Sequence, residues 1–198
     1  LKYVDLPIAA PSANVSKHVS PVTAEHVYAD LKGRIELILD GGKCSGGIES
    51  TVLDCTGEKP QILRSGLITR EMIEKVVGSC DEYVLKKGEK ALSPGMKYKH
   101  YSPSCRTMLF SFRDKNKAVE EYNKNRAQNV SAYILCDEIT AATINVNHIL
   151  NLGKTGEQIA SNLYEKLREG ENCADLIIAI APETQDGVMK GVMNRLIK

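Results

Sequence analysis

The sequence lacks the features that mark several common classes of protein. No apolar run approaches the roughly 20 residues that a membrane-spanning helix needs, and there is no signal peptide. An excess of one charge is also missing, because 26 basic and 25 acidic side chains leave a formal net charge of +1. No global field would draw this chain to nucleic acid or to a membrane, so any anion site must be local.

Cysteine and histidine are present, but without the spacing of a metal site. The cysteines, at positions 44, 55, 80, 105, 136 and 173, form no C-x-x-C pair. We interpret them as reduced, mostly buried thiols of a cytosolic protein. His18, His26, His100 and His148 are isolated, and neither a Walker A loop nor a G-x-S-x-G elbow occurs. These absences argue against zinc binding and against hydrolysis by a nucleophilic serine.

Hydrophobic periodicity predicts a mixed α/β chain of ordinary globular composition, 42% hydrophobic and 26% charged. In the first part we expect helices at 20–33 and 69–78, and strands at 35–42, 50–55 and 61–64. In the second part we expect strands at 107–112, 131–136, 147–153 and 175–182, and helices at 114–125, 155–170 and 187–198. The regular alternation in the second part favours a small, mostly parallel sheet with helices on its faces.

Two polar stretches in the first part could carry a binding site. Residues 10–21, "APSANVSKHVSP", place small hydroxyl and amide side chains between prolines, and such groups donate to phosphate or carboxylate oxygens without bulk. Residues 40–55, "DGGKCSGGIESTVLDC", place four glycines around Lys43 and Ser45, and glycine lets the backbone approach an anion. Each stretch has a plainer interpretation: a turn before a capped helix for the first, and a glycine-rich turn for the second.

A basic residue and a proline-bounded segment complete the set of candidates. Arg64 ends a strand beside a glycine, where its guanidinium could bind a phosphate or simply form a surface ion pair. Residues 93–103, "SPGMKYKHYSP", contain two tyrosines and three basic or titratable side chains between Ser-Pro pairs. Prolines stiffen both ends of this segment, so it could be either a connector between domains or a strap with a preferred path.

These stretches together resemble one family. "PIAAPSANVS", "GGIESTVLDC", "ILRSG" and "SPGMKYKHYSP" are similar to the long form of the YrdC-type threonylcarbamoyl-AMP synthases. The resemblance implies three parts: residues 1–88, the C-terminal part of a YrdC-like α/β catalytic domain; residues 89–104, an interdomain linker; and residues 105–198, a small Rossmann-like, mostly parallel α/β domain. It also implies a further stretch before Leu1, without which the 198 residues would be inactive.

The resemblance implies a reaction and a set of contacts. The family forms threonylcarbamoyl-AMP and pyrophosphate from L-threonine, bicarbonate and ATP with Mg²⁺, in the cytoplasm. Threonylcarbamoyl transferase proteins then use the product to modify tRNA. By match to the family's motifs, the following residues are expected at the site: Ala10 and Ser50 near threonine, and Ser12, Ser20 and Arg64 near ATP, with Tyr98 and Tyr101 of the linker closing over the nucleotide as a lid.

The chemistry of the residues agrees with such a reaction. Carboxylation of an amine followed by attack on a phosphate needs no protein nucleophile, but it needs aligned reactants and neutralised charge. The alternative is a non-catalytic tRNA- or nucleotide-binding module, including a regulatory nucleotide-binding domain at residues 105–198. The near-zero charge, the 5% aromatic content and the missing G-x-G-x-x-G fingerprint give this alternative little support.

Overall fold

The second half of the chain forms a four-stranded parallel sheet. The computed structural model describes residues 4–16, 18–84 and 102–197. The sheet consists of β4 (Arg106–Phe110), β5 (Ala132–Cys136), β6 (Ile149–Asn151) and β7 (Leu176–Ile180), in the order β4-β7-β5-β6. Every neighbouring pair is parallel. Because β7 lies inside the sheet with helices on both faces, all five of its residues are buried. The prediction of a small parallel α/β unit is confirmed.

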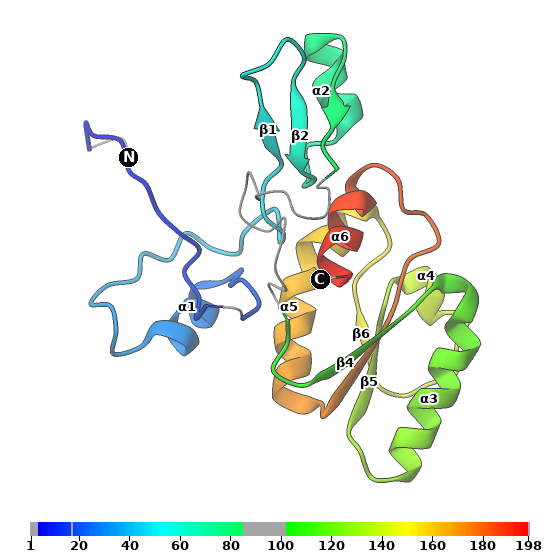
Figure 1. Ribbon diagram of the computed structural model, residues 1–198. Coiled ribbons are helices and arrows are strands. Elements are labelled where there is room, and N and C mark those ends of the chain that lie inside the picture. Colours follow the sequence, from blue (N-terminus) through cyan, green and yellow to red (C-terminus); the bar gives the residue numbers. More distant parts are fainter. Residues whose placement is uncertain (1–3, 17, 85–101, 198) are drawn as a thin grey trace.

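Helices cover both faces of this sheet (Figure 1). On one face, α3 (Lys115–Ala127) contributes Ala118 and Tyr122 to a core shared with β5 and β7. The other face packs against α5 (Gly156–Cys173) and α6 (Val188–Leu196). The short helices η1 (Phe112–Asp114) and α4 (Glu138–Ala141) follow β4 and β5. A capping box begins α5, since the Thr155 and Gln158 side chains each bond the other's backbone.

The first half of the chain is less regular. It contains α1 (Ala24–Leu31), which is capped by the Thr23 hydroxyl, and a small sheet of β1 (Val52–Asp54), β2 (Gln61–Arg64) and β3 (Asp81–Glu82). β1 and β2 are antiparallel, whereas β2 and β3 are parallel. α2 (Arg70–Val77) packs on this sheet through Ile73. Its other apolar side chains are largely exposed, however, including Val76 at 85%.

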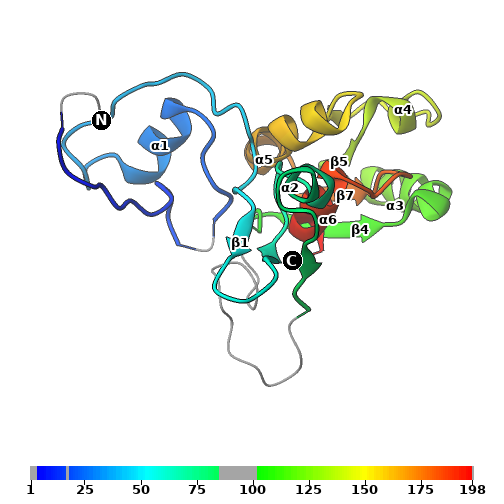
Figure 2. The same ribbon diagram turned by 90° about the horizontal axis from the view of Figure 1, so that it is seen from above.

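The N-terminal segment lies against α5 of the second half. Val19 and Val22 are at most 2% exposed, and they belong to the same core cluster as Leu163 and Tyr164 of α5. Figure 2 shows α1 and the strandless segments around it on the side of α5 that faces away from the parallel sheet. The first half of the chain is therefore anchored on the second through two valines that flank Ser20.

Two expectations are wrong. Residues 35–42 form no strand; Ile35 makes only an isolated bridge to Lys32, and Leu39 is 86% exposed. An apolar run becomes a strand only where a neighbour completes its ladder of hydrogen bonds, and no described segment pairs with this run in a ladder.

The cysteines are not mostly buried either. All six are free thiols as predicted, but only Cys80 and Cys136 are buried, while Cys44, Cys55 and Cys173 are exposed. The exposed three lie in loops or at a helix end, where no neighbouring layer covers them. Burial raises the pKa of the Cys136 thiol to about 12, so this thiol stays protonated at neutral pH.

Candidate functional site

A cavity of about 570 Å³ lies between the N-terminal segment and α5. Its volume is within the range of roughly 300–1,000 Å³ that is usual for small-molecule sites. Four segments of the first half line it, together with one side chain of α5. The lining includes Ser12, Ser20, Lys43, Gly47, Glu49 and Tyr164. Both polar stretches identified in the sequence therefore meet at one cavity.

Ser20 is held at the wall of this cavity by a carboxylate. Only 8% of the residue is exposed, and its hydroxyl donates a hydrogen bond to Glu49 Oε1 at 2.8 Å. Glu49 precedes β1, whereas Ser20 precedes α1, so the contact joins segments 29 residues apart. The glycine-rich turn and the Ser-Pro turn are thereby fastened to each other.

Side chains of α5 and α6 hold the same carboxylate. The Tyr164 hydroxyl donates to Glu49 Oε2 at 2.7 Å, and Arg195 Nε donates to the same oxygen at 3.1 Å. Burial of Glu49 raises its pKa most strongly among the separate influences. The Tyr164 hydroxyl, the Arg195 charge and the Ser20 hydroxyl together outweigh it, so the pKa ends below its ordinary value. Glu49 is therefore a carboxylate at neutral pH.

Arg195 also binds the backbone around Glu49. Its Nη2 donates to the Glu49 carbonyl at 3.1 Å, and its Nη1 donates to the Ser65 carbonyl. The side chain is only 2% exposed. A buried guanidinium with this many acceptors fixes the position of the segment that it binds.

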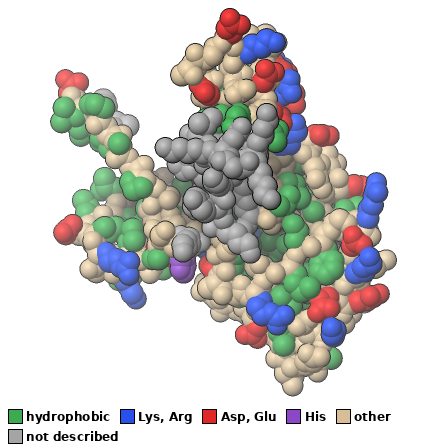
Figure 3. All heavy atoms as spheres, in the orientation of Figure 1, with side chains coloured by type: hydrophobic (Ala, Val, Ile, Leu, Met, Phe, Trp, Pro, Cys, Tyr) green, Lys and Arg blue, Asp and Glu red, His purple; other side chains and the backbone are tan. Residues whose placement is uncertain are grey.

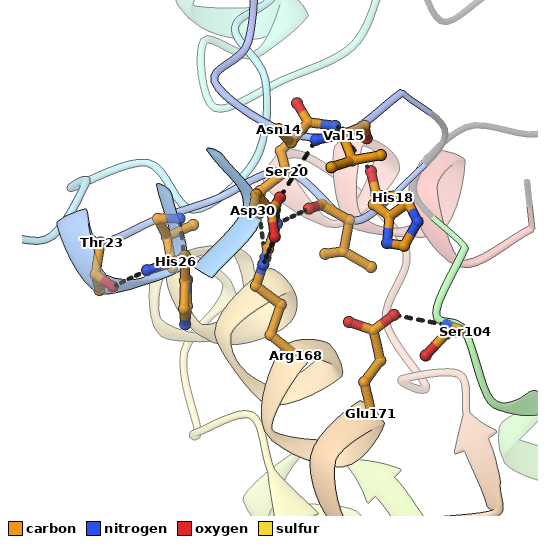
Figure 4. Close-up of polar contacts among 12 residues, drawn as sticks. Asn14, Val15, His18, Ser20, Thr23, His26, Asp30, Ser104, Arg168 and Glu171 are labelled. Carbon is orange, nitrogen blue, oxygen red and sulfur yellow. Dashed lines mark hydrogen bonds and ion pairs between the residues drawn. The ribbon is translucent and has the colours of Figure 1, made fainter. Parts of the chain in front are cut away.

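A second buried arginine anchors the other end of the N-terminal segment. Arg168 of α5 forms a bidentate pair with Asp30, with distances of 3.0 and 2.7 Å from its two Nη atoms to the two carboxylate oxygens. It also donates to the carbonyls of Val19 and Ser20 (Figure 4). Hydrogen bonding from Arg168 is the main reason why the pKa of Asp30 is lowered. Ser20 is thus held by its backbone as well as by its hydroxyl.

The glycine-rich turn uses its glycines partly for packing. Gly47 has a φ of +60°, and a Cβ at this position would lie 2.2 Å from the Ser161 carbonyl oxygen of α5. Lys43, a candidate anion ligand, instead contacts Glu165 at 2.6 Å and Asn162 at 3.0 Å, both on α5. The turn lines the cavity, but a close approach to α5 accounts for one of its glycines and for its lysine.

The remaining predicted site residues lie apart from the cavity lining. Ala10 and Ser50 are exposed, and Arg64 is half-buried. None of the three belongs to the cavity lining. Arg64 Nε donates to the Ser50 carbonyl at 3.2 Å, so these two residues are neighbours across β1 and β2. Tyr98 and Tyr101 lie outside the described residues, as does most of the predicted linker 89–104. The ligand contacts assigned to all of these residues stay predictions.

Sequence reasoning missed the residues that hold Ser20 in place. Arg168 and Arg195 lie on helix faces whose other members, such as Tyr164 and Val192, are buried. An arginine on a buried face needs a partner, and this could have indicated an ion pair. Nothing in the spacing could have named Asp30 and Glu49 as those partners, because they are more than 130 residues away.

A second cavity, of about 350 Å³, lies at the carboxyl ends of the parallel strands. This is where ligands commonly bind in open α/β sheets. Its charged lining consists mainly of carboxylates, namely Asp137, Glu157, Glu183 and Asp186, with Lys154 as the one base. Such a lining disfavours a phosphate, which agrees with the missing nucleotide fingerprint.

The described part of the chain offers no group of three or more His, Cys, Asp or Glu side chains that could hold a metal ion. The lining of the first cavity contains two carboxylates, and both have partners: Asp40 accepts from the Gly42 amide at 2.8 Å, and Glu49 is engaged as above. Among the same residues, no helix is both long and apolar enough to cross a membrane.

Comparison with known families and proteins adds an independent line of evidence on the family of this chain. Residues 68–198 match the family model described as "Threonylcarbamoyl-AMP synthase, C-terminal domain", and residues 1–66 match one described as "Telomere recombination". Two curated proteins named threonylcarbamoyl-AMP synthase are similar over nearly the whole chain: one from Bacillus subtilis (41% identity, 98% of this chain) and one from Pyrococcus abyssi (39%, 100%). The matches cover 57% and 60% of those proteins, so the chain spans little more than half their length.

A solved structure agrees. The crystal structure of P. abyssi Sua5 complexed with L-threonine matches with a TM-score of 0.80 and 37% identity, over 94% of this chain and 55% of that one. The architecture described above is therefore one that a related protein adopts.

Proposed function

Because this chain belongs to the threonylcarbamoyl-AMP synthase family, we propose that it forms part of an enzyme making threonylcarbamoyl-AMP and pyrophosphate from L-threonine, bicarbonate and ATP. The observation that carries the proposal is the 570 Å³ cavity, where the "APSAN" and "GGIES" motifs meet. The P. abyssi relative has been crystallised with L-threonine, which supports threonine as one substrate.

The reaction balances without a protein nucleophile. The threonine amine and bicarbonate condense to a carbamate with loss of water. A carbamate oxygen then attacks the α-phosphate of ATP, and pyrophosphate leaves. The protein has to align three reactants and neutralise charge on the phosphates. The hydroxyl and backbone N–H groups around the cavity suit that task, and no described cysteine or histidine is needed.

Within this proposal each predicted residue keeps its role. Ala10 and Ser50 border threonine, and Ser12, Ser20 and Arg64 contact ATP. We propose that Mg²⁺ enters on the triphosphate, because both carboxylates of the cavity are already engaged. The ion would neutralise phosphate charge. We further propose that Tyr98 and Tyr101 cover the nucleotide, that the enzyme acts in the cytoplasm, and that threonylcarbamoyl transferase proteins use its product on tRNA.

The test is an assay of pyrophosphate release by the complete gene product. Release from ATP that requires both threonine and bicarbonate would support the proposal. Salt-sensitive binding of RNA without turnover would favour the non-catalytic tRNA-binding module instead.

A further inference from the structure

Three side chains of the C-terminal α/β unit hold Ser20 at the cavity wall, one directly and two through Glu49. Tyr164 and Arg195 bind the carboxylate that accepts the Ser20 hydroxyl, and Arg168 binds the Ser20 carbonyl at 3.4 Å. All three residues are almost completely buried, with Tyr164 at 1%, Arg168 at 8% and Arg195 at 5% exposure of the whole residue. The helices α5 and α6 thus set the orientation of Ser20.

The backbones approach closely enough to make this setting rigid. Gly47, two residues before Glu49, lies directly against the backbone of α5. On α6, a Cβ at Gly191 would lie 3.3 Å from the Cα of Gly66, next to the Ser65 carbonyl that Arg195 binds. Since no side chain separates these backbones, a shift of either helix would displace the Glu49 segment.

The direction of the hydrogen bond determines what Ser20 can offer a ligand. An ionised carboxylate only accepts hydrogen bonds, and a serine hydroxyl has a single proton to donate. Glu49 carries the negative charge here, paired with Arg195 at 3.1 Å. The Ser20 hydroxyl therefore donates its one hydrogen bond to Glu49, and only the lone pairs of Ser20 Oγ remain free to face the cavity. Phosphate oxygens at neutral pH are acceptors too, so they have no hydrogen bond to gain from this hydroxyl.

We propose that Tyr164 and Arg195 are positioning residues which act through Glu49, and that they make Ser20 a hydrogen-bond acceptor for a donor group of the nucleotide rather than a phosphate ligand. The donor is the adenine amino group or a ribose hydroxyl. This inference rests on the proposed function. It gives the C-terminal unit a role in nucleotide binding, because α5 and α6 orient Ser20 without contacting the nucleotide themselves.

The test is a double-mutant cycle on pyrophosphate release by the complete gene product. We expect S20A to lower kcat/KM for ATP about 3- to 10-fold, the range for one ordinary hydrogen bond. We expect E49Q and Y164F to cause a loss of similar size alone, but less than about 2-fold in the S20A background, because they act through Ser20. K190A is the matched control, since it removes an exposed contact between α6 and Glu82. It should leave kcat/KM for ATP unchanged both alone and in the S20A background.

Nucleotide analogues identify the donor. If the adenine amino group binds Ser20, then S20A should cost nothing with purine riboside triphosphate, which lacks that group. If a ribose hydroxyl binds Ser20, the cost should vanish with 2′-deoxy-ATP or 3′-deoxy-ATP. An unchanged S20A penalty with all three analogues would overturn the assignment of a nucleotide donor.

The remaining outcomes are distinct. Equal losses from E49Q and Y164F with and without Ser20 would show a merely structural role and overturn the positioning inference, and so would an S20A protein with unaltered kinetics. Melting temperatures of each variant separate misfolding from loss of positioning, and Y164F keeps the test open if E49Q unfolds. A wild-type protein without threonine-dependent pyrophosphate release would instead defeat the proposed function itself.

Discussion

Glu49 joins the two parts of the chain through several polar contacts at once. Its carboxylate accepts from Ser20, Tyr164 and Arg195, and its pKa is held below the ordinary value of 4.5. A carboxyl group whose pKa is lowered by folding stabilises the folded state above its unfolded pKa. That contribution disappears as the pH falls through the lowered value.

This linkage predicts a pH dependence. Between pH 7 and pH 5 we expect the wild type to be more stable than E49Q by a constant amount. The difference should shrink once the pH falls below about 4.5. Urea denaturation at several pH values measures it, and comparing two proteins cancels the titration of His26 and Asp30. A difference that grows towards pH 3 would contradict the expectation.

Arg64 yields a second prediction at this scale. If its guanidinium binds the nucleotide, R64A in the complete gene product should lower kcat/KM for ATP about 10- to 100-fold. A hydrogen bond to a charged group contributes roughly 1.5–3 kcal/mol. Steady-state kinetics with varied ATP measures the change. Unaltered constants would remove Arg64 from the site.

At the scale of elements, the glycine-rich turn and α5 form a close backbone contact that can be tested with a matched pair. Gly42 and Gly47 both have positive φ, +83° and +60°, so an alanine costs backbone strain of roughly 1–2 kcal/mol at either position. A Cβ at Gly42 meets nothing within 4 Å, whereas one at Gly47 would clash with Ser161.

We therefore expect G47A to lower the melting temperature clearly more than G42A, and to loosen the N-terminal segment. Differential scanning calorimetry measures the first effect. Limited proteolysis between residues 4 and 50 measures the second, with G42A as the control. Equal behaviour of the two variants would mean that the turn does not pack on α5 in solution.

The segment 93–103 carries the lid hypothesis. Replacing Tyr98 and Tyr101 by alanine should raise wasteful hydrolysis of the adenylate or lower turnover, because a lid shields a labile intermediate from water. Comparing ATP consumed with threonylcarbamoyl-AMP formed measures the coupling. A fully coupled double variant with wild-type turnover would reduce the segment to a connector.

At the scale of the whole molecule, the first half presents unusual apolar surface. Leu6, Ile8 and Leu37 are 62–72% exposed, and hydrophobic side chains cover much of the N-terminal segment in Figure 3. The curated relatives are longer, since the matches cover only 57% and 60% of them.

We expect the purified 198-residue chain to release no pyrophosphate in a threonine-dependent reaction. The reason is length, since the matches cover only 57% and 60% of the two curated relatives. The assay described above measures this, with the complete gene product as the positive control. Turnover by the 198-residue chain at the rate of the complete product would refute the expectation.

The sequence predicted local structure well where local physics decides it. Thr23, Thr69 and Thr155 cap their helices, because a hydroxyl just before the helix start needs only a backbone N–H of the first turn. The alternating strands and helices after residue 105 led to the parallel sheet. The run at 35–42 failed, since a strand depends on a partner that its own residues do not contain.

By itself, the sequence determined most of the helices and strands, the α/β class and the motifs that resemble the synthase family, because periodicity, capping and turn chemistry act over a few residues. Only the tertiary structure decided how these motifs meet. It brought Ser20 to Glu49, and it brought Arg168 and Arg195 from helices more than 130 residues away to Asp30 and Glu49. Burial created these pairs, since a guanidinium shut off from water needs a carboxylate, and folding alone selects which one.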